Sequence, residues 1–203
     1  ISQIEKTLSN VNKKYKNNQI GLKVNRDFLN YYYSIFNVKN IESLNFTAEN
    51  TSLIIKSNGE SLFVLNNMLA TDSIQKIREF NISDALLYRS PYDYLVKKDF
   101  DKNEITFVYK IGKELYAIKE SNELMWEFTS EKKLINGYDC KKALVTYYGR
   151  QWIAWYTTKI PINAGPYKFN GLPGLILEIH DSENIFNFKA GNITFGNFDI
   201  NSN

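Results

Sequence analysis

The 203-residue chain has 25 Lys and Arg against 22 Asp and Glu, and a net charge of +3 spread along the chain does not indicate nucleic acid as the partner. The single cysteine, Cys140, cannot form an internal disulfide, and one Cys with one His cannot supply the four ligands of a structural zinc site. An aromatic share of 15% favours β structure, because large rings pack well on a pleated surface, and no apolar stretch is long enough to cross a membrane as a helix.

The first twenty residues have the pattern of an amphipathic helix. Apolar residues recur at steps of three and four with polar residues between them: Ile1, Ile4, Leu8, Val11 and Tyr15. We therefore predict a helix from about Ser2 to Tyr15, and we expect its apolar stripe to cover one face of a sheet. Asn17, Asn18 and Gly21 end this segment, and a β-rich region begins near Val24.

Most of the remaining chain is predicted to form strands, because its apolar residues alternate or run continuously. The predicted strands are Phe28 to Val38, Ser43 to Phe46, Thr51 to Lys56, Glu60 to Leu65, Glu104 to Tyr109, Leu115 to Lys119, Leu124 to Phe128, Lys142 to Tyr148 and Gln151 to Thr158. A short helix capped by Thr71 or Asp72 and a loop from Asp84 to Tyr94 interrupt them. Turn signals at Asn136-Gly137 and Gly149-Arg150 indicate antiparallel hairpins, the second with a type II′ turn.

The stretch Gly171-Leu172-Pro173-Gly174-Leu175-Ile176 is the strongest local signal in the chain. Pro173 has the φ of the second position of a β-turn and Gly174 accepts the positive φ of the third, so we predict a type II turn from Leu172 to Leu175. A strand to His180 follows, and a second strand, Ile185 to Lys189, completes a hairpin with it. Pro161 and Pro166 keep the preceding segment out of any central strand.

Several of these residues resemble the GLPGLI family of exported bacterial proteins. They are Trp155-Tyr156-Thr157, Ile160-Pro161, Gly165-Pro166, Phe169 and the complete motif Gly171 to Ile176, with Lys133, Ile135, Gly137-Tyr138, Cys140 to Ala143 and Gly149-Arg150 upstream. The resemblance covers about Trp126 to Asp181. It implies a Gram-negative cell-envelope protein, periplasmic or outer-membrane-associated, whose signal peptide has been removed and whose family has no assigned activity. Hairpins with a covering helix also resemble the half-open barrels that carry lipoproteins or lipids through the periplasm.

The sequence offers two arrangements for catalysis or metal binding, and neither is favoured. A Cys140 nucleophile would need His180 as its base, but Asp181 is poorly placed to orient that ring, because adjacent strand residues point to opposite faces. Glu178 and His180 share a face and could supply two metal ligands, but a third ligand is not evident. We therefore assign no catalytic residue, no metal site and no cofactor.

Aromatic residues near the motif are the candidates for ligand binding. Trp152 and Tyr156 lie on one strand face and Trp155 on the other, all close in sequence to the Pro-rich connection and Phe169. Such rings can line a site for an apolar ligand or a peptide, although they are more often part of a core. We predict Trp152, Trp155, Tyr156 and Phe169 as ligand contacts.

These expectations combine into one fold and three functions. The predicted fold is a single mainly β (α+β) domain over residues 1–203: a helical segment, 1–20, packs on the apolar face of one strongly curved antiparallel sheet or half-open barrel, 24–203. The first function is a non-enzymatic periplasmic binding or carrier-like protein for an apolar ligand or polypeptide. The alternatives are a docking or scaffold protein for an envelope partner, and a Cys- or metal-dependent hydrolase.

Overall fold

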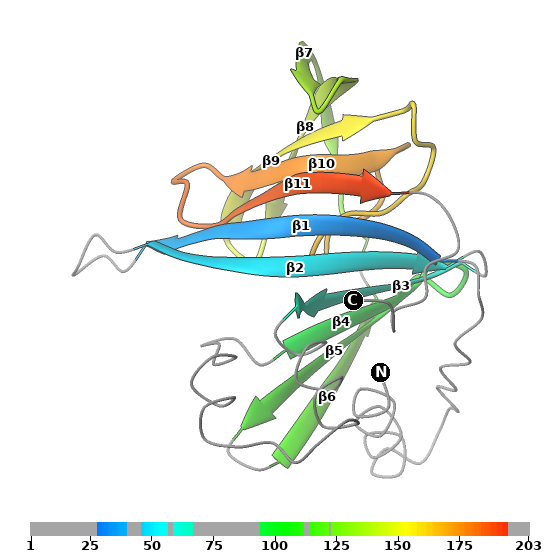
Figure 1. The fold of residues 1–203 in the computed structure, drawn as a ribbon, viewed down its shortest axis with the longest axis vertical. Coiled ribbons are helices and arrows are strands. Elements are labelled where there is room, and N and C mark those ends of the chain that lie inside the picture. Colours follow the sequence, from blue (N-terminus) through cyan, green and yellow to red (C-terminus); the bar gives the residue numbers. More distant parts are fainter. Residues whose placement is uncertain are drawn as a thin grey trace.

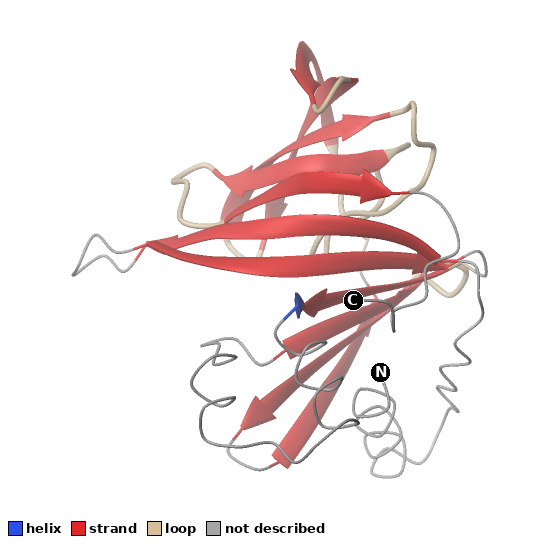
Figure 2. Cartoon of the chain, in the orientation of Figure 1, coloured by secondary structure: helices blue, strands red, loops and turns tan. Residues whose placement is uncertain are grey.

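The structure is a computed structural model that describes residues 28–39, 46–56, 59–66, 94–111, 114–121 and 123–194. Eleven β-strands account for most of these residues, and Asn66 at the end of β3 is the only helical residue among them (Figure 2). The strands are β1 (Phe28–Lys39), β2 (Phe46–Lys56), β3 (Glu60–Leu65), β4 (Tyr94–Asp99), β5 (Glu104–Ile111), β6 (Glu114–Ser121), β7 (Glu127–Ile135), β8 (Tyr138–Tyr147), β9 (Arg150–Thr157), β10 (Leu175–Asp181) and β11 (Asn187–Thr194).

The strands are hydrogen-bonded in the order β6-β5-β4-β3-β2-β1-β11-β10-β9-β8-β7, and every neighbouring pair is antiparallel (Figure 1). Two five-strand arms therefore flank β1: the first arm is β2 to β6 and the second arm is β7 to β11. The two edge strands, β6 and β7, are separated in the chain only by residues 122–126. Because this connection is short, the two arms must curve toward each other.

Tight turns join the strands of the second arm. The turn predicted at Asn136-Gly137 is present, and both residues have positive φ, 50° and 80°, as a type I′ turn requires. The next hairpin turns at Tyr148 and Gly149, with φ of 48° and 73°. Two consecutive positive φ values again indicate a type I′ turn, so the turn lies one residue earlier than predicted and is not of type II′.

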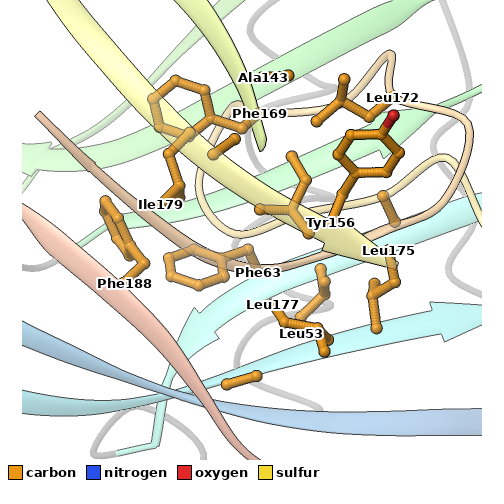
Figure 3. Close-up of a cluster of buried hydrophobic side chains, with 14 of the residues drawn as sticks. Leu53, Phe63, Ala143, Tyr156, Phe169, Leu172, Leu175, Leu177, Ile179 and Phe188 are labelled. Atoms are coloured by element: carbon orange, nitrogen blue, oxygen red, sulfur yellow. The ribbon is translucent and has the colours of Figure 1, made fainter. Parts of the chain in front are cut away.

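The core lies between the facing sides of the two arms. Leu53 and Phe63 of the first arm and Ile179 and Phe188 of the second arm are all buried (Figure 3), and Val96 of the first arm is buried with them. The rings of Phe63 and Phe188 meet edge to face with centroids 6.0 Å apart, which joins the arms directly. The connection from β9 to β10, residues 158–174, lies between the arms and contacts both of them; we call it the motif loop.

The predicted α+β class is wrong for the described chain, which is all-β: two five-strand arms flank β1, and no helix packs on them among the described residues. The predicted N-terminal helix in residues 1–20 and the short helix after Thr71 lie outside the described residues. In the part that is described, the motif loop covers the apolar face instead. Its prolines exclude it from the sheet, and its apolar side chains Ile160, Ala164, Phe169 and Leu172 are buried. The single-domain boundary at 1–203 stays a prediction.

Candidate binding site at the motif loop and the β7–β8 hairpin

The motif loop is fastened by backbone hydrogen bonds to its own ends. The amide of Leu175 donates to the carbonyl of Ile160 at 3.0 Å, and the amide of Ile176 donates to the carbonyl of Ala164 at 3.0 Å. Within the loop, the amide of Phe169 donates to the carbonyl of Pro166 and closes a turn, also at 3.0 Å. The loop is therefore built as a fixed part of the core and its buried amides find partners without a neighbouring strand.

Three glycines allow the backbone path of the motif loop, because two of them leave room for neighbouring atoms and one has a positive φ. A Cβ at Gly174 would lie 2.1 Å from the carbonyl oxygen of Thr157, and a Cβ at Gly165 would lie 2.7 Å from Cδ1 of Ile176. Gly171 has a φ of +93°, which side chains rarely adopt, whereas Gly174 does not have a positive φ. The predicted type II turn at Leu172 to Leu175 is thus not formed, and Gly174 is required for close backbone packing instead.

Two polar side chains form hydrogen bonds with the backbone of Asn170 and Gly171 in the motif loop. Nε1 of Trp126 donates to the carbonyl of Asn170 at 2.8 Å, across the start of β7. The side-chain oxygen of Asn163 accepts a hydrogen bond from the amide of Gly171. Because Gly171 lies against the Trp126 ring, the segment that precedes β7 and the motif loop form one surface.

A buried lysine that was not predicted from the sequence bonds to the backbone of the motif loop at Gly165 and Phe169. Lys98 of β4 is fully buried, and its Nζ donates to the carbonyl oxygens of Gly165 at 2.7 Å and of Phe169 at 2.6 Å. Burial removes the ammonium from water and lowers the pKa of Lys98 well below its usual value. No carboxylate in the described structure pairs with Lys98 to offset this effect. The first arm therefore grips the backbone of the motif loop through a single side chain.

A second lysine fastens the loop in the opposite direction. Lys168 lies in the motif loop with only 6% of its side chain exposed, and its Nζ lies 2.6 Å from Glu120 Oε1 on β6. Its ammonium also lies 4.7 Å from the ring centroid of Phe107 and 5.1 Å from that of Tyr148. Burial is the largest single influence and lowers the pKa of Lys168, but the hydrogen bond that Lys168 donates to Glu120, together with the nearby Glu120 and tyrosine groups, outweighs burial and the pKa is raised. Lys168 therefore remains charged and joins both arms.

Three of the four predicted ligand contacts lie in this core. Trp152, Tyr156 and Phe169 are buried, and the Trp152 and Phe169 rings pack with centroids 4.6 Å apart. Trp155 faces the other side of the sheet, where the Lys133 ammonium lies 5.3 Å from its ring centroid. The structure thus brings Trp152 and Phe169 together and separates Trp155 from them. Ligand binding by the four residues stays a prediction.

The groups considered for catalysis and metal binding have structural partners. The Cys140 thiol is buried, burial raises its pKa to about 11, and its sulfur lies 3.5 Å from the carbonyl oxygen of Tyr138. The Nδ1 of His180 lies 3.0 Å from the carbonyl oxygen of Asp181. Glu178 accepts from Lys133 at 2.9 and 3.0 Å. Across the described ranges, no group of three His, Cys, Asp or Glu side chains could hold a metal ion.

The β7–β8 hairpin has one face packed on the second arm and one face in solvent. Its turn folds back over the arm, where Asn136 Nδ2 donates to the carbonyls of Ala190 and Gly191 at 2.8 and 3.0 Å. The strand pairs Phe128 with Ala143, Lys132 with Lys141 and Leu134 with Asp139, and these residues share one side. We call the exposed set the hairpin face: Phe128, Lys132, Leu134, Asp139 and Lys141.

Large apolar side chains are exposed on and beside the hairpin face. Phe128 is 59% exposed, Leu134 is 68% exposed, and Met125, just before β7, is 85% exposed. The Phe128 ring is supported from below by Tyr156, with ring centroids 6.3 Å apart. Because β7 is an edge strand, its outer side has no neighbouring strand in the described sheet. The hairpin therefore offers both apolar side chains and a strand edge to solvent.

Comparison with known proteins locates a family match at this site. A family model described as a protein of unknown function (Porph_ging) matches residues 147–178, which contain β9, the motif loop and the first half of β10. A search of curated proteins gave no match. The matched segment contains the whole motif loop, whose backbone path depends on its glycines, on Lys168 and on the hydrogen bonds from Lys98 of β4.

Among solved structures, PNGF-II in two space groups is similar to this chain. The TM-scores are 0.60 and 0.59, with 16% and 14% identity, over 83% of this chain. The chain spans only 28% of the length of PNGF-II, and the likeness shows the fold alone. A LolA superfamily protein from Nitrosomonas europaea aligns over 96% of this chain and 94% of its own, but with a TM-score of 0.34 and 7% identity, which is too low to support an argument.

No helix formed by the described residues has the length and hydrophobicity needed to span a membrane.

Proposed function

We propose that the protein is a non-enzymatic binding module of the Gram-negative cell envelope, related to the GLPGLI proteins, that recognises a polypeptide segment of an envelope partner through the hairpin face. One observation carries the proposal: Phe128 and Leu134 lie on the same exposed side of an edge hairpin, at 59% and 68% exposure. Large apolar residues at such a position are a common basis of protein recognition. The exposed strand edge adds backbone groups that a polypeptide can pair with and a lipid cannot.

The packing of the motif loop between the arms argues against a carrier that holds a large apolar ligand at this position. Trp152 and Phe169 contact each other, and Lys98 holds the loop through two carbonyl groups. A ligand at the position of Phe169 would have to displace the motif loop, which would expose its buried side chains and leave the Lys98 ammonium in the core without acceptors. Binding at the surface requires no such change.

The predicted ligand residues take supporting positions in this proposal. Tyr156 supports Phe128 from beneath, while Trp152 and Phe169 keep the motif loop in place. Trp155 lies beside Lys133, on the side of the sheet covered by the folded-back hairpin. A hairpin held in one position binds with less loss of conformational entropy than one that must first become ordered.

The proposal is tested by selecting peptides that bind the purified protein and measuring their Kd by isothermal titration calorimetry. The site variant carries Phe128→Ser and Leu134→Ser, and the control carries Ile118→Ser, an apolar residue of β6 that is 47% exposed on the other arm. We expect the site variant to weaken binding at least about tenfold, because central apolar contacts dominate recognition, and the control to leave it unchanged.

Circular dichroism spectra of all three proteins establish that the fold is retained. Equal affinity for the site variant and the native protein would place binding elsewhere and refute the proposed site. Native mass spectrometry of protein purified from its own envelope is the second measurement. A stoichiometric lipid released on denaturation, together with no peptide binding, would refute the polypeptide proposal in favour of a carrier.

A further inference from the structure

The β7–β8 hairpin contains two lysines placed directly opposite each other. Lys132 of β7 pairs in register with Lys141 of β8, and both side chains are exposed on the hairpin face. Directly opposed residues of an antiparallel pair have Cβ atoms about 4.5–5.5 Å apart, and like charges at that spacing destabilise the pair. The hairpin therefore retains an electrostatic cost at this position.

The neighbouring lysines of the same hairpin are neutralised. Lys133 pairs with Glu178 at 2.9 Å, and Lys142 pairs with Glu131 at 2.7 Å. Neither Lys132 nor Lys141 has an ion pair within the part of the chain that the structure describes. Asp139 is the one acidic residue of the hairpin face, and it lies opposite Leu134, without an ion pair to either lysine. Charge is thus balanced on the packed side of the hairpin and left in excess on the exposed side.

We propose that the partner segment is acidic, and that Lys132 and Lys141 together bind one of its carboxylates while Leu134 and Phe128 bind apolar residues on either side. The inference rests on the proposed function and names the chemistry of its partner. A carboxylate between the two ammonium groups would remove their repulsion, so the cost stored in the free protein would contribute to binding.

The arrangement along β7 defines the sequence that the partner should carry. Lys132 lies between Leu134 toward the turn and Phe128 beyond an irregularity in the β7–β8 pairing. An extended segment with an apolar, an acidic and an apolar residue facing the hairpin would match this order. Asp139 would repel a second carboxylate at the turn end, so the complementary segment is acidic at its centre and uncharged at that end.

The test compares three versions of one binding peptide whose central residue is Glu, Gln or Lys. Affinity is measured by fluorescence anisotropy at low and high salt for the native protein, for a variant with Lys132→Gln and Lys141→Gln, and for a Lys159→Gln control. Lys159 is an exposed lysine of the motif loop and is not part of the β7–β8 hairpin. Exposed ion pairs of this kind are weak, so we expect the Glu peptide to bind about fivefold more tightly than the Gln peptide at low salt. High salt or the double variant should remove this preference, and the control should keep it.

The outcomes separate this inference from the proposed function. If the Glu and Gln peptides bind equally while Phe128→Ser with Leu134→Ser abolishes both, the acidic partner is refuted and the polypeptide site stands. If no peptide binds, the proposed function fails. If vesicles of phosphatidylglycerol and phosphatidylcholine bind through the two lysines and no peptide does, the partner is an anionic membrane surface and both proposals are refuted.

Discussion

Replacement of Gly174 by alanine tests whether the motif records a close backbone contact. The added Cβ would lie 2.1 Å from the carbonyl oxygen and 2.7 Å from the carbonyl carbon of Thr157, and 3.1 Å from Cα of Thr158. All three atoms belong to the backbone, so rotation of a side chain cannot relieve the contact. Ordinary van der Waals contact begins at 3.4 Å, and the two segments must therefore separate by more than an ångström.

The expected loss of stability follows from what this separation disturbs. Overpacking in a core costs about 1–3 kcal/mol. Leu175, the next residue, begins β10 opposite Thr157 and donates to the Ile160 carbonyl, and weakening this hydrogen bond adds roughly 1 kcal/mol. The lower entropy of the unfolded alanine chain returns about 0.4–1 kcal/mol. We expect Gly174→Ala to lower the free energy of unfolding by about 3 kcal/mol, and Tm by roughly 6–12 °C.

Gly137→Ala is the matched control, since it places a side chain on a residue of positive φ without creating a close contact. Gly137 has a φ of +80° and no atom within 4 Å of an added Cβ, so alanine there should cost only about 1 kcal/mol. Urea unfolding followed by tryptophan fluorescence gives both free energies. If Gly174→Ala destabilises the protein no more than Gly137→Ala does, the motif loop can move away from β9, and close packing is not the reason for this glycine.

Three further predictions concern the buried polar groups. The pKa of Lys98 is lowered in the native protein, so between that pKa and 10.5 the unfolded chain binds more protons, and the free energy of unfolding rises with pH by at most about 1.4 kcal/mol per pH unit. Urea unfolding from neutral pH to about pH 10 should show a smaller rise of this free energy in Lys98→Met than in the native protein. An equal rise in both proteins would contradict the lowered pKa of Lys98. Glu120→Gln removes the charge paired with buried Lys168 and should cost about 2 kcal/mol in thermal unfolding, whereas Glu104→Gln, at a more exposed pair, should cost less than about 1 kcal/mol; similar losses would refute the role of burial. The Cys140 thiol, with a pKa of about 11, should resist iodoacetamide in the native protein and react in urea, as mass spectrometry can follow; rapid native alkylation would show that the thiol is accessible.

The fold was predictable where its signals are local. The apolar run of β3 gave both of its bounds, Glu60–Leu65, and Asn136-Gly137 marked the position of a hairpin turn because both residues tolerate positive φ. The strand β4, Tyr94–Asp99, was missed because Lys97 and Lys98 have the composition of an exposed segment. The motif loop could not be assigned to the core from its sequence, since its burial depends on an arm made by residues far away in the chain.

The candidate site was less predictable, because its contacts join distant segments. Strand alternation places Lys98 on the same side as Val96, but only the carbonyls of Gly165 and Phe169 explain why an ammonium can be buried there. Trp126 was expected within a strand, whereas β7 begins at Glu127 and the Trp126 indole bonds to the motif loop. Composition can indicate that aromatic rings are numerous, but it cannot say which of them face solvent.

The central position of β1 has a consequence for how the chain reaches its native state. Residues of β1 pair with β2 on one side and with β11 on the other, so that Tyr33 lies opposite both Thr51 and Ala190. The first arm can form from neighbouring hairpins, but the second arm joins it only when β11, the last described strand, is available. Pairings between such distant segments close large loops and make folding slow. During synthesis, the inner face of the first arm is therefore exposed until the second arm has formed, and in that interval it can aggregate.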